Sequence, residues 1–158
     1  MFHIVLVEPE IPPNTGNIAR LCLATGSRLH LVKPLGFSLD EKSLRRAGLD
    51  YWQDVDLRIW DSFDQVFEDA GGGEGTARFH FLTTKASQAY WSATFQTDDY
   101  LVFGRETKGL PESLLEQHPD RLLTIPMPGD AARSLNLATS AGIVLYEALR
   151  QTQLSMDS

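Results

Sequence analysis

Apolar residues along the chain gather in short runs, and the segments between these runs carry apolar residues at helical spacing. The first run, FHIVLVE (2–8), is continuous and rich in β-branched residues, which is typical of a strand covered on both faces. Strands that alternate with helices indicate an α/β fold with a mostly parallel sheet. We find no internal repeat, linker or low-complexity tract and therefore expect a single domain, residues 1–158. The pattern predicts strands at 2–8, 28–34, 56–60, 78–84, 100–104 and 121–127, and helices at 17–25, 40–48, 61–70, 111–117 and 134–151.

The composition is that of a soluble globular protein, with 42% apolar and 22% charged residues. The first residues lack the basic start of a secretory signal, and no apolar run approaches the ~20 residues that a membrane span requires. Cys22 is the only cysteine, so no intrachain disulfide is possible, and we expect a cytoplasmic protein. We expect no metal site, because the four histidines lack the spacing of metal ligands: they are His3, His30, His80 and His118.

The net charge of −7 argues against a general nucleic-acid-binding protein, which is usually basic. The charge is unevenly distributed: residues 1–60 hold seven Lys or Arg and seven Asp or Glu, whereas residues 61–158 hold seven and fourteen. A local basic surface near the N-terminal third is therefore compatible with the sequence. Its densest piece is KSLRRAG (42–48).

The stretch PEIPPNTGNIAR (9–20) follows the first predicted strand and is unusually stiff and polar. Its two adjacent prolines fix their own φ angles and lack backbone donors, so we expect residues 9–16 to form neither a regular strand nor a regular helix. Asn14 or Thr15 can then cap the helix that follows.

Asn17 and Arg20 lie one turn apart near the start of that predicted helix. An amide beside a guanidinium at a helix N-terminus suits an anionic or hydroxyl-rich ligand such as a phosphodiester. The same residues also fit a capped helix with an ordinary surface arginine. On these residues alone, both interpretations are open.

Two further loops follow predicted strands and repeat this arrangement. FGRETKGLP (103–111) holds two glycines five residues apart, and the carboxylate of Glu106 between them could accept hydrogen bonds from a ligand. IPMPGDAARSLNLATSAG (125–142) begins with a proline-rich loop, and we expect Ser134 to cap its helix. Each loop also fits a plain strand-to-helix connection. Three such loops at the carboxyl ends of strands, however, lie where open α/β sheets bind their ligands.

The usual nucleotide-binding motifs are missing from the sequence. No G-x-G-x-x-G follows the first predicted strand, and no G-x-x-x-x-G-K-[ST] occurs. GGGEG (71–75) lies between a predicted helix and a predicted strand, which is typical of a flexible loop and is the wrong order for a phosphate-binding turn. A plain nucleotide-binding domain is therefore the weakest of the alternatives.

The three loops together resemble the signature motifs of a known family. E-P-x-I-P-x-N-T-G-N-x-x-R, G-x-E-x-x-G-L-P and I-P-M…S-x-N-L occur here in the order found in the SPOUT-class RNA 2′-O-ribose methyltransferases, and the resemblance is closest to the short TrmL type. It covers nearly the whole chain, including RRAGLDYW (45–52) and YLVFG (100–104). The resemblance implies an α/β domain with a C-terminal deep trefoil knot, and a homodimer. Ala141 and Tyr146, on the slim last helix, are our candidate dimer surface.

The resemblance also implies a reaction and a cofactor. The expected reaction is methylation of the 2′-hydroxyl of the wobble nucleotide, a cytidine or modified uridine, in the anticodon arm of tRNA, with leucine tRNAs as the expected substrates. S-adenosylmethionine would be the methyl donor and S-adenosylhomocysteine the product. Carried over by motif, the cofactor pocket would include Leu82, Thr83, Gly104, Glu106, Gly109, Ile125, Met127, Ser134, Leu135 and Asn136.

Arg20 matches the position of the family's candidate catalytic residue, and Asn17 lies beside it. A guanidinium stays protonated and is a poor base. Our hypothesis is therefore that Arg20 orients the 2′-hydroxyl and its neighbouring phosphate and lowers the pKa of that hydroxyl. The proton would then leave to phosphate or water.

An acidic and short chain implies that the dimer surface itself grips the anticodon arm. We expect Arg20, Lys42, Arg45 and Arg46 to contact the RNA, although KSLRRAG also fits a solvated helix face. Two alternatives are an rRNA methyltransferase of the same fold and a non-catalytic RNA-binding relative. The lack of an additional N-terminal domain favours tRNA as the substrate, and the intact motifs argue against a loss of catalysis.

Overall fold

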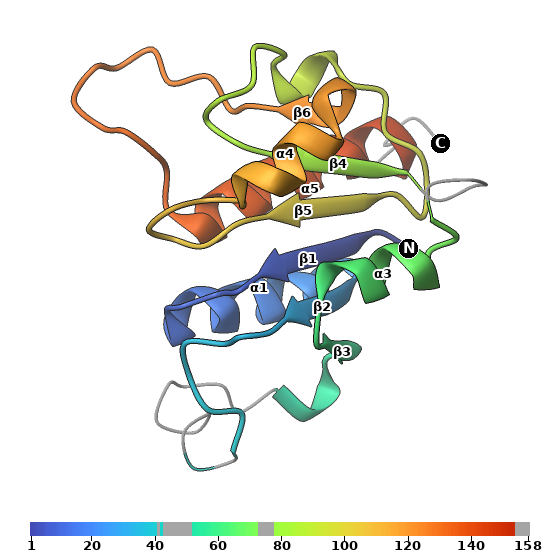
Figure 1. The fold of residues 1–158 in the computed structure, drawn as a ribbon. Coiled ribbons are helices and arrows are strands. Elements are labelled where there is room, and N and C mark those ends of the chain that lie inside the picture. The colour runs from blue at the N-terminus through green and yellow to red at the C-terminus, as the bar shows by residue number, and fades with distance from the viewer. Residues whose placement is uncertain (41, 43–51, 73–77, 154–158) are drawn as a thin grey trace.

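The computed structural model describes residues 1–40, 42, 52–72 and 78–153 of the chain. Within these residues, six strands form one sheet in the order β3-β2-β1-β5-β4-β6, and every strand pair is parallel (Figure 1). This confirms the prediction of an α/β fold with a mostly parallel sheet. The strands are β1 (His3–Val7), β2 (Arg28–Val32), β3 (Leu57–Trp60), β4 (Phe79–Leu82), β5 (Tyr100–Phe103) and β6 (Leu122–Leu123). The helices are α1 (Pro12–Thr25), α3 (Phe63–Asp69), α4 (Glu112–Gln117) and α5 (Leu137–Thr152), with short 3₁₀ turns η1 (Trp52–Asp54), η2 (Tyr90–Ser92) and η3 (Pro119–Arg121).

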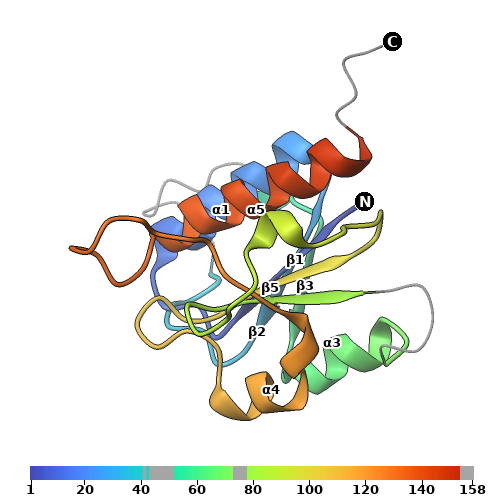
Figure 2. The same ribbon diagram turned by 90° about the horizontal axis from the view of Figure 1, so that it is seen from above.

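The strand order reverses direction beside β1, which pairs with β2 on one side and with β5 on the other. The chain builds outward from β1 to β2 and β3, and the later strands extend the sheet on the opposite side. Helices α1 and α5 cover one face of the sheet, and α3 and α4 cover the other (Figure 2). The carboxyl ends of the strands at such a reversal are where open α/β sheets usually bind a ligand.

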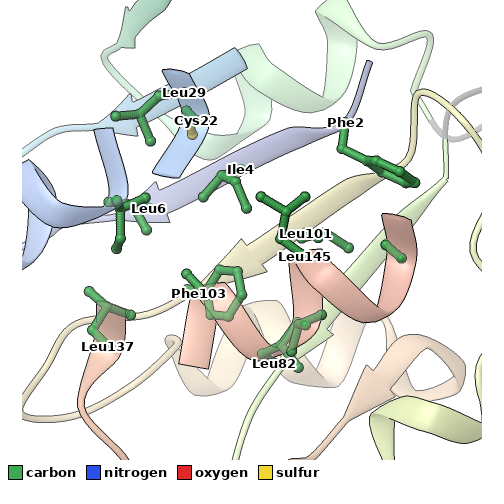
Figure 3. Close-up of a cluster of buried hydrophobic side chains, with 14 of the residues drawn as sticks. Phe2, Ile4, Leu6, Cys22, Leu29, Leu82, Leu101, Phe103, Leu137 and Leu145 are labelled. Atoms are coloured by element: carbon green, nitrogen blue, oxygen red, sulfur yellow. The ribbon is translucent and has the colours of Figure 1, made fainter. Parts of the chain in front are cut away.

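Alternate residues of β1 point into two separate cores, as its continuous apolar run predicts. Ile4 and Leu6 belong to the larger cluster, on the side of α1 and α5, whereas Val5 and Val7 belong to the cluster on the other face. Figure 3 shows side chains of β1, β5 and α5 meeting in the larger cluster. The predicted apolar stripe of the last helix is buried in full: Leu137, Ala141, Val144, Leu145 and Ala148.

The first helix begins five residues earlier than predicted, so residues 12–16 are helical rather than irregular. The two prolines occupy the first turn, where backbone N–H groups have no partner within the helix, and their missing donors therefore cost no helical hydrogen bond. The predicted caps are also wrong. Ile11 is the N-cap without any side-chain cap, whereas Asn14 and Thr15 are buried within the helix itself.

The last helix begins three residues later than predicted, and its N-cap is Asn136 rather than Ser134. The side-chain oxygen of Asn136 accepts hydrogen bonds from the backbone N–H groups of Ala138 and Thr139, at 2.9 and 3.2 Å. Asparagine and serine are both good N-cap residues, so the capping preference alone could not decide between them.

Two other predicted elements differ from the structure. β6 has two residues instead of the predicted seven at 121–127. The next residue, Thr124, pairs with the loop after β4 rather than with β4 itself. Its backbone N–H donates to the Gln88 carbonyl and its carbonyl accepts from the Tyr90 N–H, both at 2.9 Å. The predicted helix at 40–48 lies almost entirely outside the described residues.

Candidate active site

A cavity of about 450 Å³ opens at the carboxyl ends of the strands. Its wall comes from the end of β4 and from the three loops singled out in the sequence, which follow β1, β5 and β6. In Figure 1 these loops lie at one edge of the sheet, to which the strand arrows point. Contact of this wall with a cofactor stays a prediction, but all ten residues predicted for that role line the cavity: Leu82, Thr83, Gly104, Glu106, Gly109, Ile125, Met127, Ser134, Leu135 and Asn136.

The loop between β5 and α4 begins with a tight turn that requires glycine. A Cβ atom on Gly104 would lie 2.1 Å from both the carbonyl carbon of Gly109 and the backbone nitrogen of Leu110. Two backbone hydrogen bonds between Arg105 and Gly109, at 2.9 and 3.2 Å, close the turn. Gly109 itself has a φ of +69°, which favours glycine. The two glycines therefore shape one wall of the cavity.

The carboxylate of Glu106, in the same turn, is engaged by the protein itself. It accepts hydrogen bonds from the backbone N–H groups of Glu10 and Ile11, at 2.9 and 2.7 Å, and from Nδ2 of Asn14 at 3.3 Å. In the reverse direction, the Glu10 carboxylate accepts from the side-chain hydroxyl and the backbone N–H of Thr107, and these hydrogen bonds lower the pKa of Glu10. The loop after β5 is thereby fastened to the start of α1.

The loop after β6 joins these hydrogen bonds through Asn14. Nδ2 of Asn136 donates to Oδ1 of Asn14 at 3.0 Å, while Oδ1 of Asn136 caps α5. Asn14 lines the cavity and is 8% exposed. From the sequence, Asn14 was expected only as a helix cap, because nothing local shows that its partners lie 92 and 122 residues away. We call the side chains of Glu106, Asn14 and Asn136 the Asn14 network.

Four cationic side chains line the cavity although the chain is acidic: Lys85, Arg105, Lys108 and Arg133. Lys85 forms an ion pair with Glu112. Nε of the half-buried Arg105 is buried and has no hydrogen-bond partner within the described part of the chain. A buried donor without a partner in a cavity wall fits an acceptor on a bound molecule. None of these four cations was expected in the site from the sequence.

The predicted catalytic residues lie on α1, outside the lining of the cavity. Arg20 and Asn17 are exposed, and the described residues offer the Arg20 guanidinium neither a hydrogen bond nor an ion pair. Among the predicted RNA contacts, Lys42 is exposed, whereas Arg45 and Arg46 lie outside the described residues. One chain therefore brings the ten cavity residues together but leaves Arg20 apart from them.

The outer side of α5 is partly open. Tyr146 is 47% exposed, and apart from the backbone of α5 itself no atom of the described residues lies within 4 Å of the position that a Cβ on Gly142 would take. Ala141, in contrast, is fully buried in the core beneath the helix. The expectation that Ala141 belongs to an outer surface is therefore wrong, because it lies on the stripe that faces the sheet.

No helix in the described ranges is long and apolar enough to cross a membrane. The same ranges hold no group of three or more His, Cys, Asp or Glu side chains placed to bind a metal ion. Three of the histidines, His3, His30 and His80, are instead buried, and their rings form hydrogen bonds inside the fold. His80 contacts Asp99 at 2.8 Å, and His3 contacts His30 at 2.8 Å.

The parallel sheet has a cavity of small-molecule size at its strand-order reversal, and three polar loops form much of the cavity wall. This arrangement defines the class of α/β proteins whose ligand sites are built from loops at the carboxyl ends of the strands. The chain belongs to the SpoU rRNA methylase family, whose model matches residues 1–146. Its structural neighbours share the fold class expected from the sequence, an α/β domain with a C-terminal trefoil knot.

The relatives of this chain are RNA methyltransferases. A tRNA (cytidine(34)-2′-O)-methyltransferase of Yersinia pestis is 50% identical over 154 residues, which cover 96% of this chain and 94% of that protein. A solved structure concerned with the 2-OH methylation of C/U34 on tRNA has 48% identity and a TM-score of 0.86, over 96% of this chain and 95% of that one. The SpoU methyltransferase AviRb of Streptomyces viridochromogenes, solved with the cofactor AdoMet, has 25% identity and a TM-score of 0.80, over 94% of this chain and 57% of AviRb.

Proposed function

We propose that this protein is a tRNA methyltransferase that transfers a methyl group from S-adenosylmethionine to the 2′-hydroxyl of nucleotide 34, the wobble nucleotide of the anticodon. One observation carries the proposal: the three loops matched to one enzyme family by their motifs converge, together with the end of β4, on one cavity. The 50% identity to the Yersinia enzyme over nearly the full length of both chains supports the same reaction and a cytidine or uridine as the target nucleotide.

S-adenosylmethionine is our proposed occupant of the cavity. The volume of about 450 Å³ lies within the ~300–1,000 Å³ of small-molecule sites. Apolar side chains such as Leu82, Phe103 and Ile125 can cover a flat base, and the backbone of the 104–109 turn offers donors and acceptors. The unpaired Nε of Arg105 can donate to an acceptor of the ligand. When bound, the cofactor supplies the methyl group, and AdoMet complexes of two SpoU-type relatives support this assignment.

Arg20 is proposed to act on the acceptor hydroxyl. Its guanidinium stays protonated, so it holds the 2′-hydroxyl and the adjacent phosphate through paired hydrogen bonds rather than removing a proton. The positive charge stabilises the negative charge that develops on the oxygen, and the proton leaves to phosphate or water. Asn17, one turn earlier and also exposed, can bind the ribose from the same side of α1.

A homodimer is proposed to complete the site. Arg20 lies outside the cavity of its own chain, and the exposed Tyr146 lies in the same helical layer, α1 and α5 (Figure 2). Two copies joined through this layer can place Arg20 of one chain near the cavity of the other. We further propose that the dimer binds the anticodon arm of leucine tRNAs through Lys42, Arg45 and Arg46, in the cytoplasm.

The test is methyl transfer from labelled S-adenosylmethionine to bulk tRNA, with the labelled nucleotide mapped afterwards. We expect label on the 2′-oxygen of nucleotide 34, and we expect Arg20→Ala to abolish transfer while cofactor binding stays within threefold. Arg121→Ala is the matched control, because Arg121 is an exposed arginine that does not line the cavity. Arg20→Lys keeps one charge but loses the paired hydrogen bonds, so near-wild-type activity of that variant would refute the orienting role.

An rRNA methyltransferase is the second candidate, because the family and an AdoMet-bound relative from Sinorhizobium meliloti at 26% identity are named for rRNA. This chain covers 57% of that relative, whereas it covers 94% of the Yersinia tRNA enzyme. Transfer of label to ribosomal RNA but not to tRNA would favour the second candidate. Absence of transfer to either RNA, with the cofactor bound, would favour a non-catalytic relative.

A further inference from the structure

We propose that Asn14 is a positioning residue, which locks helix α1, and with it Arg20, to the wall of the cofactor cavity. The proposal rests on the function proposed above, because it assigns Asn14 a part in aligning the two halves of that site. The Asn14 side chain joins the first turn of α1 to the loops after β5 and β6, through Glu106 and Asn136.

The contacts of Asn14 use both ends of its amide. The Nδ2 group donates to the Glu106 carboxylate at 3.3 Å, and Oδ1 accepts from Nδ2 of Asn136 at 3.0 Å. Both partners belong to the cavity wall, whereas Asn14 belongs to α1. The side chain is 8% exposed, so water offers it little replacement for either hydrogen bond.

The two cavity loops keep their own shape without Asn14. Glu106 still accepts from the backbone of Glu10 and Ile11, and Asn136 still caps α5. Loss of the Asn14 amide therefore leaves the cavity wall in place, with Glu106 still bound to the residues just before α1, and removes the two hydrogen bonds that the Asn14 side chain, within α1, makes with that wall. Arg20 follows Asn14 by six residues on the same helix, about 9 Å along its axis at the usual rise per residue. In the proposed dimer, a tilt of α1 consequently moves Arg20 relative to the cofactor cavity of the other chain, near which the dimer places it.

The variant Asn14→Asp distinguishes the positioning role of Asn14 from a role in the stability of α1. Position 14 is in the first turn of α1, after the two prolines, where a negative charge stabilises a helix through its dipole. A merely structural role in α1 therefore predicts an unchanged or improved protein. The positioning role predicts the opposite, because the new carboxylate would face the Glu106 carboxylate without a donor between them.

The experiment measures kcat and KM for methyl transfer to tRNA, together with the Kd for S-adenosylmethionine by calorimetry. For Asn14→Asp we expect kcat to fall by about 100-fold, the usual scale for a catalytic group displaced by ~1 Å, with the Kd within threefold. The double variant Asn14→Asp/Glu106→Gln restores one donor and one acceptor across the contact, and we expect it to recover about tenfold in kcat.

Two further variants control for folding. Asn14→Ala removes both hydrogen bonds without adding charge and should lower kcat in the same way. Thr25→Ala removes a hydrogen bond of 2.9 Å to the Leu21 carbonyl at the other end of α1, far from the cavity lining, and should keep kcat. A wild-type kcat in Asn14→Asp, or a double variant no faster than the single one, would overturn the proposal.

Amide hydrogen exchange of α1 keeps the two proposals distinguishable. If the wild-type protein transfers no methyl group to tRNA, the proposed function fails, and hydrogen exchange then decides the role of Asn14. We expect S-adenosylmethionine to slow exchange in the first two turns of wild-type α1 and to leave exchange in Asn14→Asp unchanged. Equal slowing in both proteins would show that the cavity wall holds α1 without Asn14.

Discussion

Replacement of Gly104 by alanine tests whether the turn after β5 is as tight as its geometry indicates. The added Cβ would lie 2.1 Å from two backbone atoms of the turn, whereas ordinary contact begins near 3.4 Å. Both neighbours are backbone atoms, so no flexible side chain can move away. Overpacking of this kind costs ~1–3 kcal/mol, and the two hydrogen bonds that close the turn contribute ~1 kcal/mol each. We therefore expect the free energy of unfolding to fall by roughly 3–5 kcal/mol.

Two other glycines provide matched controls for the same chemical change. A Cβ on Gly142, inside α5, meets nothing within 4 Å, so alanine there should be neutral or stabilise by up to about 1 kcal/mol through helix propensity. A Cβ on Gly109 also meets nothing, but its φ of +69° adds a penalty of roughly 1–2 kcal/mol. The expected order of stability is therefore Gly142→Ala, then Gly109→Ala, then Gly104→Ala.

The assay is thermal unfolding of the three variants, followed by calorimetric titration with S-adenosylhomocysteine. For a domain of this size, a loss of 3–5 kcal/mol corresponds to a Tm lower by roughly 6–20 °C. We expect Gly104→Ala to bind the product weakly, because the displaced turn forms one wall of the cavity. A Gly104→Ala protein with the Tm and the product affinity of the wild type would refute the geometric reasoning.

Three further predictions concern other parts of the molecule. Asn136→Ala removes the cap of α5 and should lower the free energy of unfolding by about 1–2 kcal/mol; an unchanged Tm would contradict this. Burial lowers the pKa of His3 to about 4 and that of His30 to about 3. As the pH falls below ~6.5, these histidines therefore bind protons in the unfolded chain before they do so in the folded one. The free energy of unfolding, measured with urea, should fall from pH ~6.5 toward 4, by at least ~2 kcal/mol at pH 5. An unchanged urea midpoint between pH 7 and 5 would exclude neutral buried histidines. Tyr146→Glu should produce monomers in sedimentation while the far-UV circular dichroism stays that of the wild type, and a surviving dimer would exclude this part of α5 from the interface.

Strands β1, β2, β4 and β5 were predictable because a strand buried on both faces is apolar almost throughout. Ile4 and Val5 show this by pointing into different cores. The boundaries that failed depend on distant contacts. β6 ends after Leu123 because the next residue pairs with the loop after β4 instead of the sheet. Helix α1 starts early because prolines, which break the interior of a helix, are compatible with its first turn. Neither the pairing of the residue after Leu123 nor the early start of α1 can be predicted from the secondary-structure propensities of single residues.

The cavity wall was predictable from motifs, and its connection to α1 was not. Motifs record which residue types recur together, so Gly104 and Asn136 could be assigned to one pocket without knowing their distance. The role of Asn14 depends on partners 92 and 122 residues away, which no local pattern reveals. The unpaired Arg105 Nε was equally hidden, because whether a side chain is buried without a partner is known only after the chain is folded.

The proline-rich start of α1 explains how a single amide can join this helix to two loops. A helix leaves its first N–H groups without partners, and a side chain of the first turn usually has to cap them. Here two of those positions are prolines, and the N–H groups of Glu10 and Ile11, just before them, are both taken by Glu106. The N–H of Asn14 donates to the Ile11 carbonyl at 3.1 Å. No capping side chain is needed, so the amide of Asn14 is available to Glu106 and Asn136 instead. The stiffness that made this stretch look like a break in the chain is therefore what lets α1 be fixed directly against the cavity.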